Sequence, residues 1–307
     1  MAVRKIEQEI ERLSLLRDAP ADEAAAGLRK ALRDRVNLVV AKAAKTAGER
    51  RLAGLIPDLI AAFNRLMEKA AERDPQCQGK TAIVKALMEM EFSEAAVFAR
   101  GLRHVQLEAS FGPPEDTAGP MRAQCALALP ACTDLTRAEV FRLLIDANVD
   151  KDFTVRMEVA RAWAQMEGDE AALLLRLKAR LGDKESQVSG QVFDALLALE
   201  GPQALPFVAE FLTLEGQREE AALALGASRL VGAVELLRRC LERTRELDFR
   251  SVLLRAISAS RQSEAIELLL QMVREGGADA APAFEALKLH RESPEIWKRV
   301  EEARAGG

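Results

Sequence analysis

The side chains suited to nucleophilic catalysis or to metal binding are few in this sequence and stand far apart. The 307 residues include two histidines, His104 and His290, and four cysteines. Metal sites need several His, Cys or carboxylate ligands that converge, and none of these residues has ligand spacing. Cys125 and Cys132 share a helical spacing, but Pro130 interrupts the helix between them, so we interpret both as core thiols. A serine nucleophile needs a partnered base, and the positions of the histidines do not supply one.

A short run from Gly79 through Lys80 to Thr81 resembles the end of a phosphate-binding loop. The first glycine of that motif would fall at Asp74, and no strand is predicted before it. We therefore interpret the run as a turn between two helices. Cys77 stands near the start of the second helix, which is expected to make its thiol somewhat more acidic, but no His or second Cys is placed to use it.

The remaining titratable residues are typical of helix ends and helix faces. We expect His104 and His290 each to end a helix, where the helix dipole stabilises an imidazolium. Adjacent carboxylates such as Glu219 and Glu220 indicate a solvated face, whereas paired acid chemistry needs one carboxyl group to be buried and perturbed. The sequence therefore predicts no enzyme activity, no metal and no cofactor.

The element that positions these residues is a helix, an acidic turn and a second helix, and its clearest copy runs from Leu144 to Trp163. Asp150 and Asp152 precede the second helix, where a short carboxylate accepts hydrogen bonds from the free N–H groups of the first turn. Apolar residues then recur at helical spacing, at Val155, Val159, Ala162 and Met166. They predict a helix with one buried face.

The same pattern returns along the chain, each time with a small alanine where two helices are expected to cross. These alanines are Ala43, Ala86, Ala126, Ala162, Ala195, Ala224, Ala256 and Ala286. Successive positions are 29 to 43 residues apart. A period in this range is typical of stacked helical hairpins, which share one core because no hairpin can bury its apolar face alone.

The clearest copy resembles the signature of HEAT repeats, with aspartates in the turn and Val-Arg opening the second helix. The matching residues are Asp150, Asp152, Val155, Arg156 and Ala162. The next copy keeps Asp183, Glu185, Val188, Ala195 and Leu196, with Ser189 in place of the arginine. Other copies either hold the basic position, as at Lys80, Arg218 and Arg250, or depart from it, as at Asn37, Pro120 and Ala280. The resemblance is clearest from Asp134 onward, and we expect the departures to break any ladder of Asp–Arg contacts between turns. We expect Arg156 and Asp152 to be structural.

We therefore expect an all-α fold, a right-handed α-solenoid (superhelix) of about eight stacked antiparallel helix pairs with N- and C-terminal capping helices. A single solenoid would span residues 1–307, with divergent N-terminal helical repeats at 1–110, an irregular loop at 111–121 and regular HEAT-like repeats at 122–307. The N-terminal cap carries an apolar stripe of Val3, Ile6, Ile10 and Leu13. A coiled-coil contact with a second chain is the alternative for this helix, but two heptads are few for one.

The segment from Ser110 to Met121 contains three prolines and two glycines, which exclude a helix. Loops of this kind on a rigid scaffold often carry function. A slack insertion between the divergent and the regular repeats explains the segment equally well. An exposed Phe111 would favour the functional interpretation.

Composition agrees with an all-helical intracellular protein. Apolar residues make up 49% of the chain, Tyr is absent, and the sequence pI is about 5.6. The charged N-terminus lacks the apolar core of a signal peptide, and no uncharged apolar run approaches the ~20 residues of a membrane span. Cysteines without paired spacing fit a reducing compartment. We expect a cytoplasmic protein without membrane contact, and we favour a monomer.

The HEAT resemblance implies that the second helix of each repeat lines a concave face, where we expect the partner. The outward column on these helices is Lys42, Lys85, Cys125, Arg161, Asp194, Leu223, Arg255 and Glu285. Adding two methionines four positions earlier, the predicted partner-binding residues are Lys42, Lys85, Met121, Met157 and Arg161. Residues 1–110 carry a net charge of +3 and the remainder −7, which favours an acidic partner near the N-terminal end.

The leading hypothesis is a non-catalytic protein–protein interaction scaffold that binds a partner protein on the concave face. Some HEAT-like proteins are DNA glycosylases, so nucleic-acid binding is one alternative. The acidic pI, the absence of Tyr and the core position of Trp163 disfavour it. Bilin lyases also resemble HEAT arrays, which makes a bilin-lyase-like accessory protein a further alternative, but no residue here matches a tetrapyrrole site.

Overall fold

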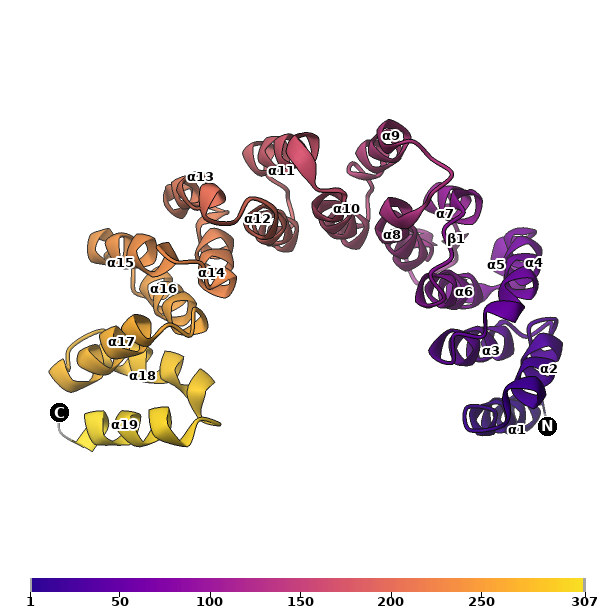
Figure 1. The fold of residues 1–307 in the computed structure, drawn as a ribbon, viewed down its shortest axis with the longest axis horizontal. Coiled ribbons are helices and arrows are strands. Elements are labelled where there is room, and N and C mark those ends of the chain that lie inside the picture. The colour runs from indigo at the N-terminus through magenta and orange to yellow at the C-terminus, as the bar shows by residue number, and fades with distance from the viewer. Residues whose placement is uncertain (1, 306–307) are drawn as a thin grey trace. The chain divides into compact units, whose positions relative to one another are not determined.

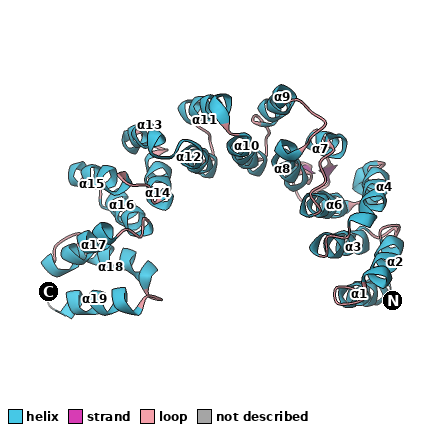
Figure 2. Cartoon of the chain, viewed as in Figure 1, coloured by secondary structure: helices cyan, strands magenta, loops and turns pink. Residues whose placement is uncertain are grey.

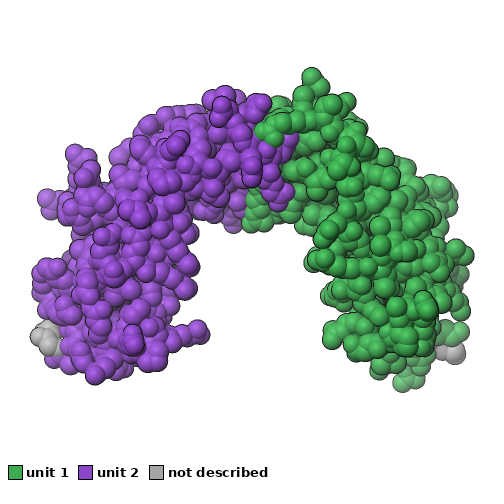
Figure 3. All heavy atoms as spheres, in the orientation of Figure 1, with its two compact units in different colours: residues 1–162 green, residues 163–307 purple. Residues whose placement is uncertain are grey.

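The computed structural model describes residues 2–305, and the side chains of residues 4–305. Apart from one short hairpin, the regular structure in this range is helical, so the predicted all-α class is confirmed (Figures 1 and 2). The side chain of Val3, one member of the predicted N-terminal stripe, lies outside the described residues. The chain divides into two compact units, Met1–Ala162 and Trp163–Gly307 (Figure 3).

The first unit contains short helices and one β-hairpin. Its helices are α1 (Ala2–Leu15), α2 (Ala21–Ala31), α3 (Asn37–Glu49), α4 (Ile56–Met67), α5 (Ala70–Arg73), α6 (Gln78–Glu89), α7 (Ala95–Leu102), α8 (Gly119–Ala128), α9 (Arg137–Ala147) and the first turns of α10 (Phe153–Met166). Short 3-10 turns are η1 (Ala53–Leu55), η2 (Pro75–Cys77) and η3 (Leu129–Ala131). The hairpin pairs β1 (Leu107–Glu108) antiparallel with β2 (Glu115–Asp116), so that Leu107 lies opposite Asp116.

Alternate helices of the first unit pack directly on one another. Helix α3 packs on α6 and α6 packs on α8, while α2, α4 and α7 flank α3, α6 and α8 in turn. The α3–α6 crossing is close, because a Cβ added to Gly48 would lie 2.8 Å from the Cα of Ala86. Only glycine allows two backbones to approach this far.

The second unit repeats this arrangement. Its helices are α11 (Gly168–Leu181), α12 (Ser186–Glu200), α13 (Leu205–Glu210), α14 (Arg218–Ser228), α15 (Ala233–Arg243), α16 (Leu247–Ala259), α17 (Ser263–Glu275), α18 (Ala280–Leu287) and α19 (Pro294–Ala305), with 3-10 turns η4 (Gly201–Ala204), η5 (Phe211–Thr213) and η6 (Lys288–His290). Helices α12, α14, α16 and α18 pack in series, and α11, α13, α15 and α17 each pack on one of them. At the α14–α16 crossing, a Cβ on Gly226 would lie 2.1 Å from the carbonyl oxygen of Ala256.

The alanines expected at helix crossings lie in the core. All eight, from Ala43 to Ala286, are exposed by 4% or less. A larger side chain at these positions would separate helices that the structure holds in contact. The sequence pattern therefore located these eight core positions correctly.

The segment predicted as an irregular loop, residues 111–121, is shorter and more ordered than expected. Its start is the tip of the β1–β2 hairpin, and its last three residues belong to α8, which begins at Gly119. Pro120 stands at the start of that helix. Proline suits this position because the first N–H groups of a helix have no partner within it, so the proline here begins a helix and does not exclude one.

The predicted ladder of contacts between turns is more continuous than the sequence suggested. Asn37, expected to break it, donates a hydrogen bond from Nδ2 to Asp74 Oδ1 at 3.0 Å. Pro120 was also expected to break it, but Arg122, one half-turn further on, donates to both oxygens of Asp150 at 2.7 and 2.8 Å. Arg156 donates to the carbonyl oxygen of Asp150 at 2.7 Å, so it is structural as expected.

One stretch of the second unit, Ser186–Thr213, is long and apolar enough by composition to cross a membrane, with a mean hydropathy of 1.2 and half of its apolar window buried. The stretch is not one continuous helix, because the positive φ of Gly201 (59°) marks the end of α12. Helix α12 packs on α11 and α14, and α13 packs on α14. The apolar composition is therefore explained by the core of this unit.

Candidate functional site

The five predicted partner-binding residues lie on four helices of the first unit, α3, α6, α8 and α10. Lys85 on α6 and Arg161 on α10 are exposed, and Lys42 on α3 and Met157 on α10 are half-buried. Met121 is fully buried in α8, with its sulfur 3.8 Å from the Cys77 sulfur. Met121 is therefore a core residue, and its prediction as a surface contact is wrong.

The outward column predicted on the second helices is otherwise exposed or half-buried in the structure. The exception is Cys125, which is fully buried. Both errors fall on α8, whose start at Gly119 lies next to the hairpin. The sequence pattern assigned this helix the wrong face because the proline-rich segment concealed where it begins.

A hollow of the first unit lies between the hairpin and the turn that joins α9 to α10. This hairpin groove has a volume of about 890 Å³. Its lining residues are Leu102, Arg103, Val105, Leu107, Pro114, Asp116, Arg122, Leu143, Asp146, Ala147, Val149, Asp150, Lys151, Asp152 and Phe153. Among its apolar residues, Val105, Leu107 and Val149 are exposed by 59%, 62% and 80%. Water therefore covers apolar surface on both walls of the groove.

Phe111 at the hairpin tip is also fully exposed, which is the observation that favours a functional role for this segment. Exposed phenylalanine and valine side chains are unfavourable in water unless a partner covers them for part of the time. The hairpin itself has strands of only two residues each. So short a hairpin is not stable alone and needs support from its surroundings.

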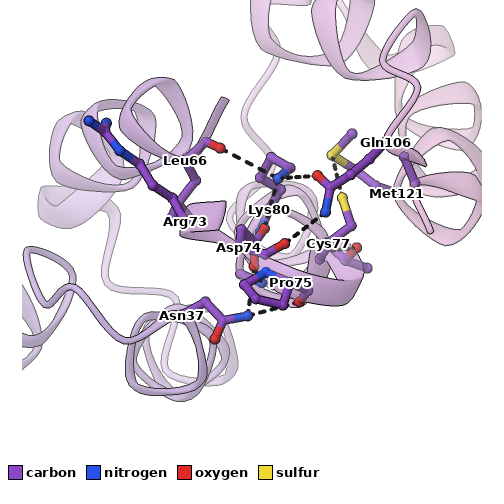
Figure 4. Close-up of polar contacts among 12 residues, drawn as sticks. Asn37, Leu66, Arg73, Asp74, Pro75, Cys77, Lys80, Gln106 and Met121 are labelled. Atoms are coloured by element: carbon purple, nitrogen blue, oxygen red, sulfur yellow. Dashed lines mark hydrogen bonds and ion pairs between the residues drawn. The ribbon is translucent and has the colours of Figure 1, made fainter. Parts of the chain in front are cut away.

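That support is a polar cluster at the base of the hairpin, centred on Gln106 (Figure 4). The Gln106 side chain accepts a hydrogen bond from Lys80 Nζ at 2.8 Å and donates to the carbonyl oxygen of Asp74 at 2.8 Å. It also donates to Glu108 Oε1 at 2.5 Å, while its backbone N–H donates to Asp116 Oδ1 at 3.0 Å. Gln106 thereby joins both strands of the hairpin to the turn before α6, through its side chain to β1 and through its backbone N–H to β2.

Lys80 and Asp74 form an ion pair of 3.0 Å in which both side chains are fully buried. The Asp74 carboxylate also accepts from the backbone N–H groups of Gly79 at 2.7 Å and Lys80 at 2.9 Å, and so caps the start of α6. A buried pair of this kind is stable only when further hydrogen bonds satisfy both charges, as they do here. Lys80 is thus enclosed in the structure and cannot serve as the lysine of a phosphate-binding loop.

Arg122 holds the other side of the hairpin. Its guanidinium donates to Asp116 Oδ2 at 2.7 Å, to both oxygens of Asp150 and to the carbonyl oxygen of His104 at 3.0 Å. Its side chain is only 4% exposed. Arg122 therefore ties the strand β2 to the α9–α10 turn, which are the two walls of the groove. We call the polar residues Asp74, Lys80, Gln106, Glu108, Asp116, Arg122 and Asp150 the hairpin frame.

Two of the three carboxylates of the hairpin strands, Glu108 and Asp116, are held in their ionised form. Burial opposes ionisation of Glu108, but hydrogen bonds from Gln106, Thr117 and the backbone of Gln76 outweigh it and lower the Glu108 pKa. Burial likewise opposes ionisation of Asp116, but backbone N–H groups of Gln106 and Ala118 and the side chain of Arg122 lower the Asp116 pKa. At neutral pH the charges of Glu108 and Asp116 are therefore compensated by hydrogen-bond donors within the frame and beside it.

The histidines differ from the sequence expectation, because neither is suited to an imidazolium. Burial lowers the pKa of His104 and of His290. Sequence reasoning also missed that His290 lies 3.1 Å from the Ser258 hydroxyl. Ser258 is fully buried and donates to the carbonyl oxygen of Ala286 at 2.7 Å, so its hydroxyl is neither accessible to a substrate nor free to attack one.

The cysteine expectation is also corrected. Burial raises the pKa of the Cys77 thiol to about 12, which outweighs any effect of the helix start. Within residues 2–305, no group of three or more His, Cys, Asp and Glu side chains is placed to hold a metal ion.

No family model matches this chain, and no curated protein gives a significant match. The functional residues must therefore be argued from the geometry. Sequence reasoning missed the hairpin frame because its members are far apart in the chain, such as Lys80 and Gln106. The available signal was Phe111 in a segment rich in proline and glycine.

Proposed function

We propose that the protein is a non-catalytic scaffold with a HEAT-like α-solenoid arrangement, and that it binds a partner protein. The serial packing of α3, α6 and α8 in one unit and of α12, α14, α16 and α18 in the other supports this arrangement. Stacked helical hairpins of this kind present extended surfaces to partners. The exposed side chains of Lys85 and Arg161 on the second helices belong to the face that the HEAT resemblance assigns to binding.

The hairpin groove is where we propose that the partner is held most firmly, and the observation that carries the proposal is its exposed apolar wall. Leu107 on one side and Val149 on the other lie beside a groove of about 890 Å³, within the range of about 300–1,000 Å³ typical of ligand sites. The hairpin frame fixes both walls, so binding would not incur the entropy cost of ordering them.

The occupant we propose is an extended protein segment that inserts apolar side chains between the walls. The groove rim supports a segment of mixed charge, because it carries the carboxylate of Asp146 and the cations Arg103 and Lys151, all exposed. Apolar insertion supplies the affinity in such a groove, and the rim charges set the register.

The test compares capture of native partners by the unaltered protein and by a variant with Leu107→Ser and Val149→Ser. The control carries Leu15→Ser and Val231→Ser, since Leu15 and Val231 are exposed by 71% and 86% but do not line the groove. We expect the groove variant to lose a discrete protein that the control retains, after nuclease treatment of the lysate. Equal capture by both variants would contradict the proposal, and loss of every partner after nuclease would favour nucleic-acid binding.

A further inference from the structure

The second unit contains a hollow of a different character. It has a volume of about 460 Å³ and lies among η5, α14, α15 and the start of α16. Its lining residues are Ala209, Leu212, Thr213, Arg218, Leu236, Arg239, Cys240, Arg243, Thr244, Arg245, Glu246 and Phe249. Four of these are arginines and one is a glutamate. We call this hollow the arginine pocket.

One arginine of the pocket is fixed in the structure. Arg218 forms an ion pair with Glu246 through two hydrogen bonds, one of them 3.0 Å from Nη1 to Oε1. Its guanidinium lies 4.6 Å from the centre of the Phe249 ring. The stacking on Phe249 and the pairing with Glu246 hold the Arg218 guanidinium in one position, so that it forms a rigid part of the pocket lining. Glu246 is thereby already engaged.

Two carboxylates of α15 are engaged as well. Glu235 accepts from Arg238 and from Arg239 Nε at 2.7 Å, and Glu242 accepts from Arg238 at 2.6 Å. Arg243 and Arg245 are exposed, and within residues 2–305 neither has a carboxylate within ion-pair distance. The pocket therefore has two uncompensated guanidinium groups at its mouth, in a chain whose net charge is −4.

The floor of the pocket is apolar. Leu212 and Phe249 are almost fully buried, and Leu236 lines the pocket beside them. Thr213 and Thr244 also line the pocket, with the Thr213 hydroxyl donating to the carbonyl oxygen of Glu210 at 3.1 Å and the Thr244 hydroxyl 3.8 Å from the Cys240 sulfur. A ligand that fits this distribution carries carboxylates for the mouth and an apolar side chain for the floor. Guanidinium groups suit carboxylates in particular, because their planar N–H donors match both oxygens.

We propose that the arginine pocket binds an acidic peptide segment of a partner protein, with carboxylates on Arg243 and Arg245 and an apolar side chain on the Leu212, Leu236 and Phe249 floor. Charge complementarity identifies the occupant, since these two cations have no partner of their own. This site lies in the second unit and does not depend on the hairpin groove. Its failure would leave the proposal for the groove unaffected.

Cys240 provides a local readout of occupancy. It lines the pocket and is partly exposed, whereas Cys77, Cys125 and Cys132 are buried. Burial raises the pKa of the Cys240 thiol, so its alkylation by iodoacetamide is expected to be slow but measurable at mildly alkaline pH. A peptide seated in the pocket should slow that alkylation further by covering the sulfur.

The experiment measures the affinity of the 307-residue protein for a fluorescent peptide of alternating Glu and Leu. Two control peptides have the same length: one alternates Lys and Leu, and the other alternates Glu and Ser. We expect binding of the Glu-Leu peptide that weakens with salt, because exposed charges are screened. The Arg243→Gln, Arg245→Gln variant should weaken binding at least about tenfold, since charge-assisted hydrogen bonds are lost. Arg255→Gln with Arg274→Gln removes the same charge from exposed positions outside the pocket and should have little effect.

Three results would overturn the proposal. These are no binding of the Glu-Leu peptide, equal binding by the Arg243→Gln, Arg245→Gln variant, or no protection of Cys240 at saturating peptide. Equal binding of the Glu-Ser peptide would remove the role of the apolar floor. A single-stranded oligonucleotide of equal charge is included, and if it alone bound and protected Cys240, the pocket would be assigned to nucleic acid.

Discussion

The hairpin frame of the first unit and the arginine pocket of the second unit use charged side chains in opposite ways. In the frame, Lys80 and Arg122 are almost fully buried and each is paired with carboxylates. In the pocket, Arg243 and Arg245 are exposed and have no carboxylate partner within the described part of the chain. The same residue types therefore hold a surface in place in one unit and remain available to a ligand in the other.

The difference follows from burial. A charge removed from water needs a full set of partners, and removing one partner leaves the other uncompensated in a medium that solvates it poorly. A charge that stays in water needs no partner and gains little from one. Stability should therefore depend on the frame cations and not on the pocket cations, whereas ligand affinity should depend on the pocket cations.

The largest expected effect is on the frame. Lys80→Met keeps an unbranched side chain that is one heavy atom shorter, but leaves the buried Asp74 carboxylate without its cation. We expect the free energy of unfolding to fall by about 3–5 kcal/mol, measured by urea denaturation. The control is Lys85→Met, an exposed lysine on the same helix, which should change it by less than about 0.5 kcal/mol. Similar values for both variants would contradict the buried role of Lys80.

A smaller loss of stability, confined to the hairpin, is expected when the pH is lowered. The lowered pKa values of Glu108 and Asp116 mean that the folded hairpin binds fewer protons than the unfolded chain, so their contribution is present above the ordinary carboxyl pKa values of 4.5 and 3.8. This stabilisation is lost as the pH falls below 4.5 and 3.8 and passes through the lower pKa values that the two carboxyl groups have in the folded state. Hydrogen exchange at the Thr117 N–H, which donates to Gln106 at 2.9 Å, should lose protection there after correction for intrinsic rates.

The matched variant for this acid effect carries Glu108→Gln and Asp116→Asn. It should be less protected at neutral pH and should show little further change on acidification. If the unaltered protein keeps its protection at Thr117 down to the lowest pH at which α6 remains folded, the carboxylates do not hold the hairpin.

The smallest change in the free energy of unfolding is expected for substitutions in the arginine pocket. The Arg243→Gln, Arg245→Gln variant, which weakens peptide binding, should change the free energy of unfolding by less than about 0.5 kcal/mol. Urea denaturation measures this directly beside Lys80→Met. A loss comparable to that of Lys80→Met would show that the pocket arginines support the fold, and the contrast between the two units would disappear.

The sequence predicted the helices and their buried faces because a helix is encoded locally. Ala86 and Ala256 were assigned to crossings from their spacing alone, and both are fully buried. The hairpin was missed because its two-residue strands give no periodic signal. Met121 was placed on the wrong face for a related reason, since the start of α8 was hidden behind three prolines.

The two candidate sites were recoverable to different degrees. The segment that holds Phe111 was singled out from its proline and glycine content, but the sequence supported a functional loop and a slack insertion equally. The frame was not singled out, because Lys80, Gln106 and Arg122 meet only through tertiary packing. The arginine pocket was missed as well, because Arg239 and Arg243 on a helix are equally typical of a solvated face. Only the positions of the neighbouring carboxylates distinguish an arginine available to a ligand from an arginine on a solvated helix face.

The enclosure of Lys80 has a consequence for the chemical labelling of this protein. An amine in a buried ion pair is shielded from acylating reagents, and it reacts only when the segment around it opens. The reaction rate at Lys80, relative to an exposed amine such as that of Lys85, therefore measures how often the turn before α6 separates from Gln106. Because that turn anchors the hairpin, the same rate reports the fraction of time for which the groove loses one of its walls.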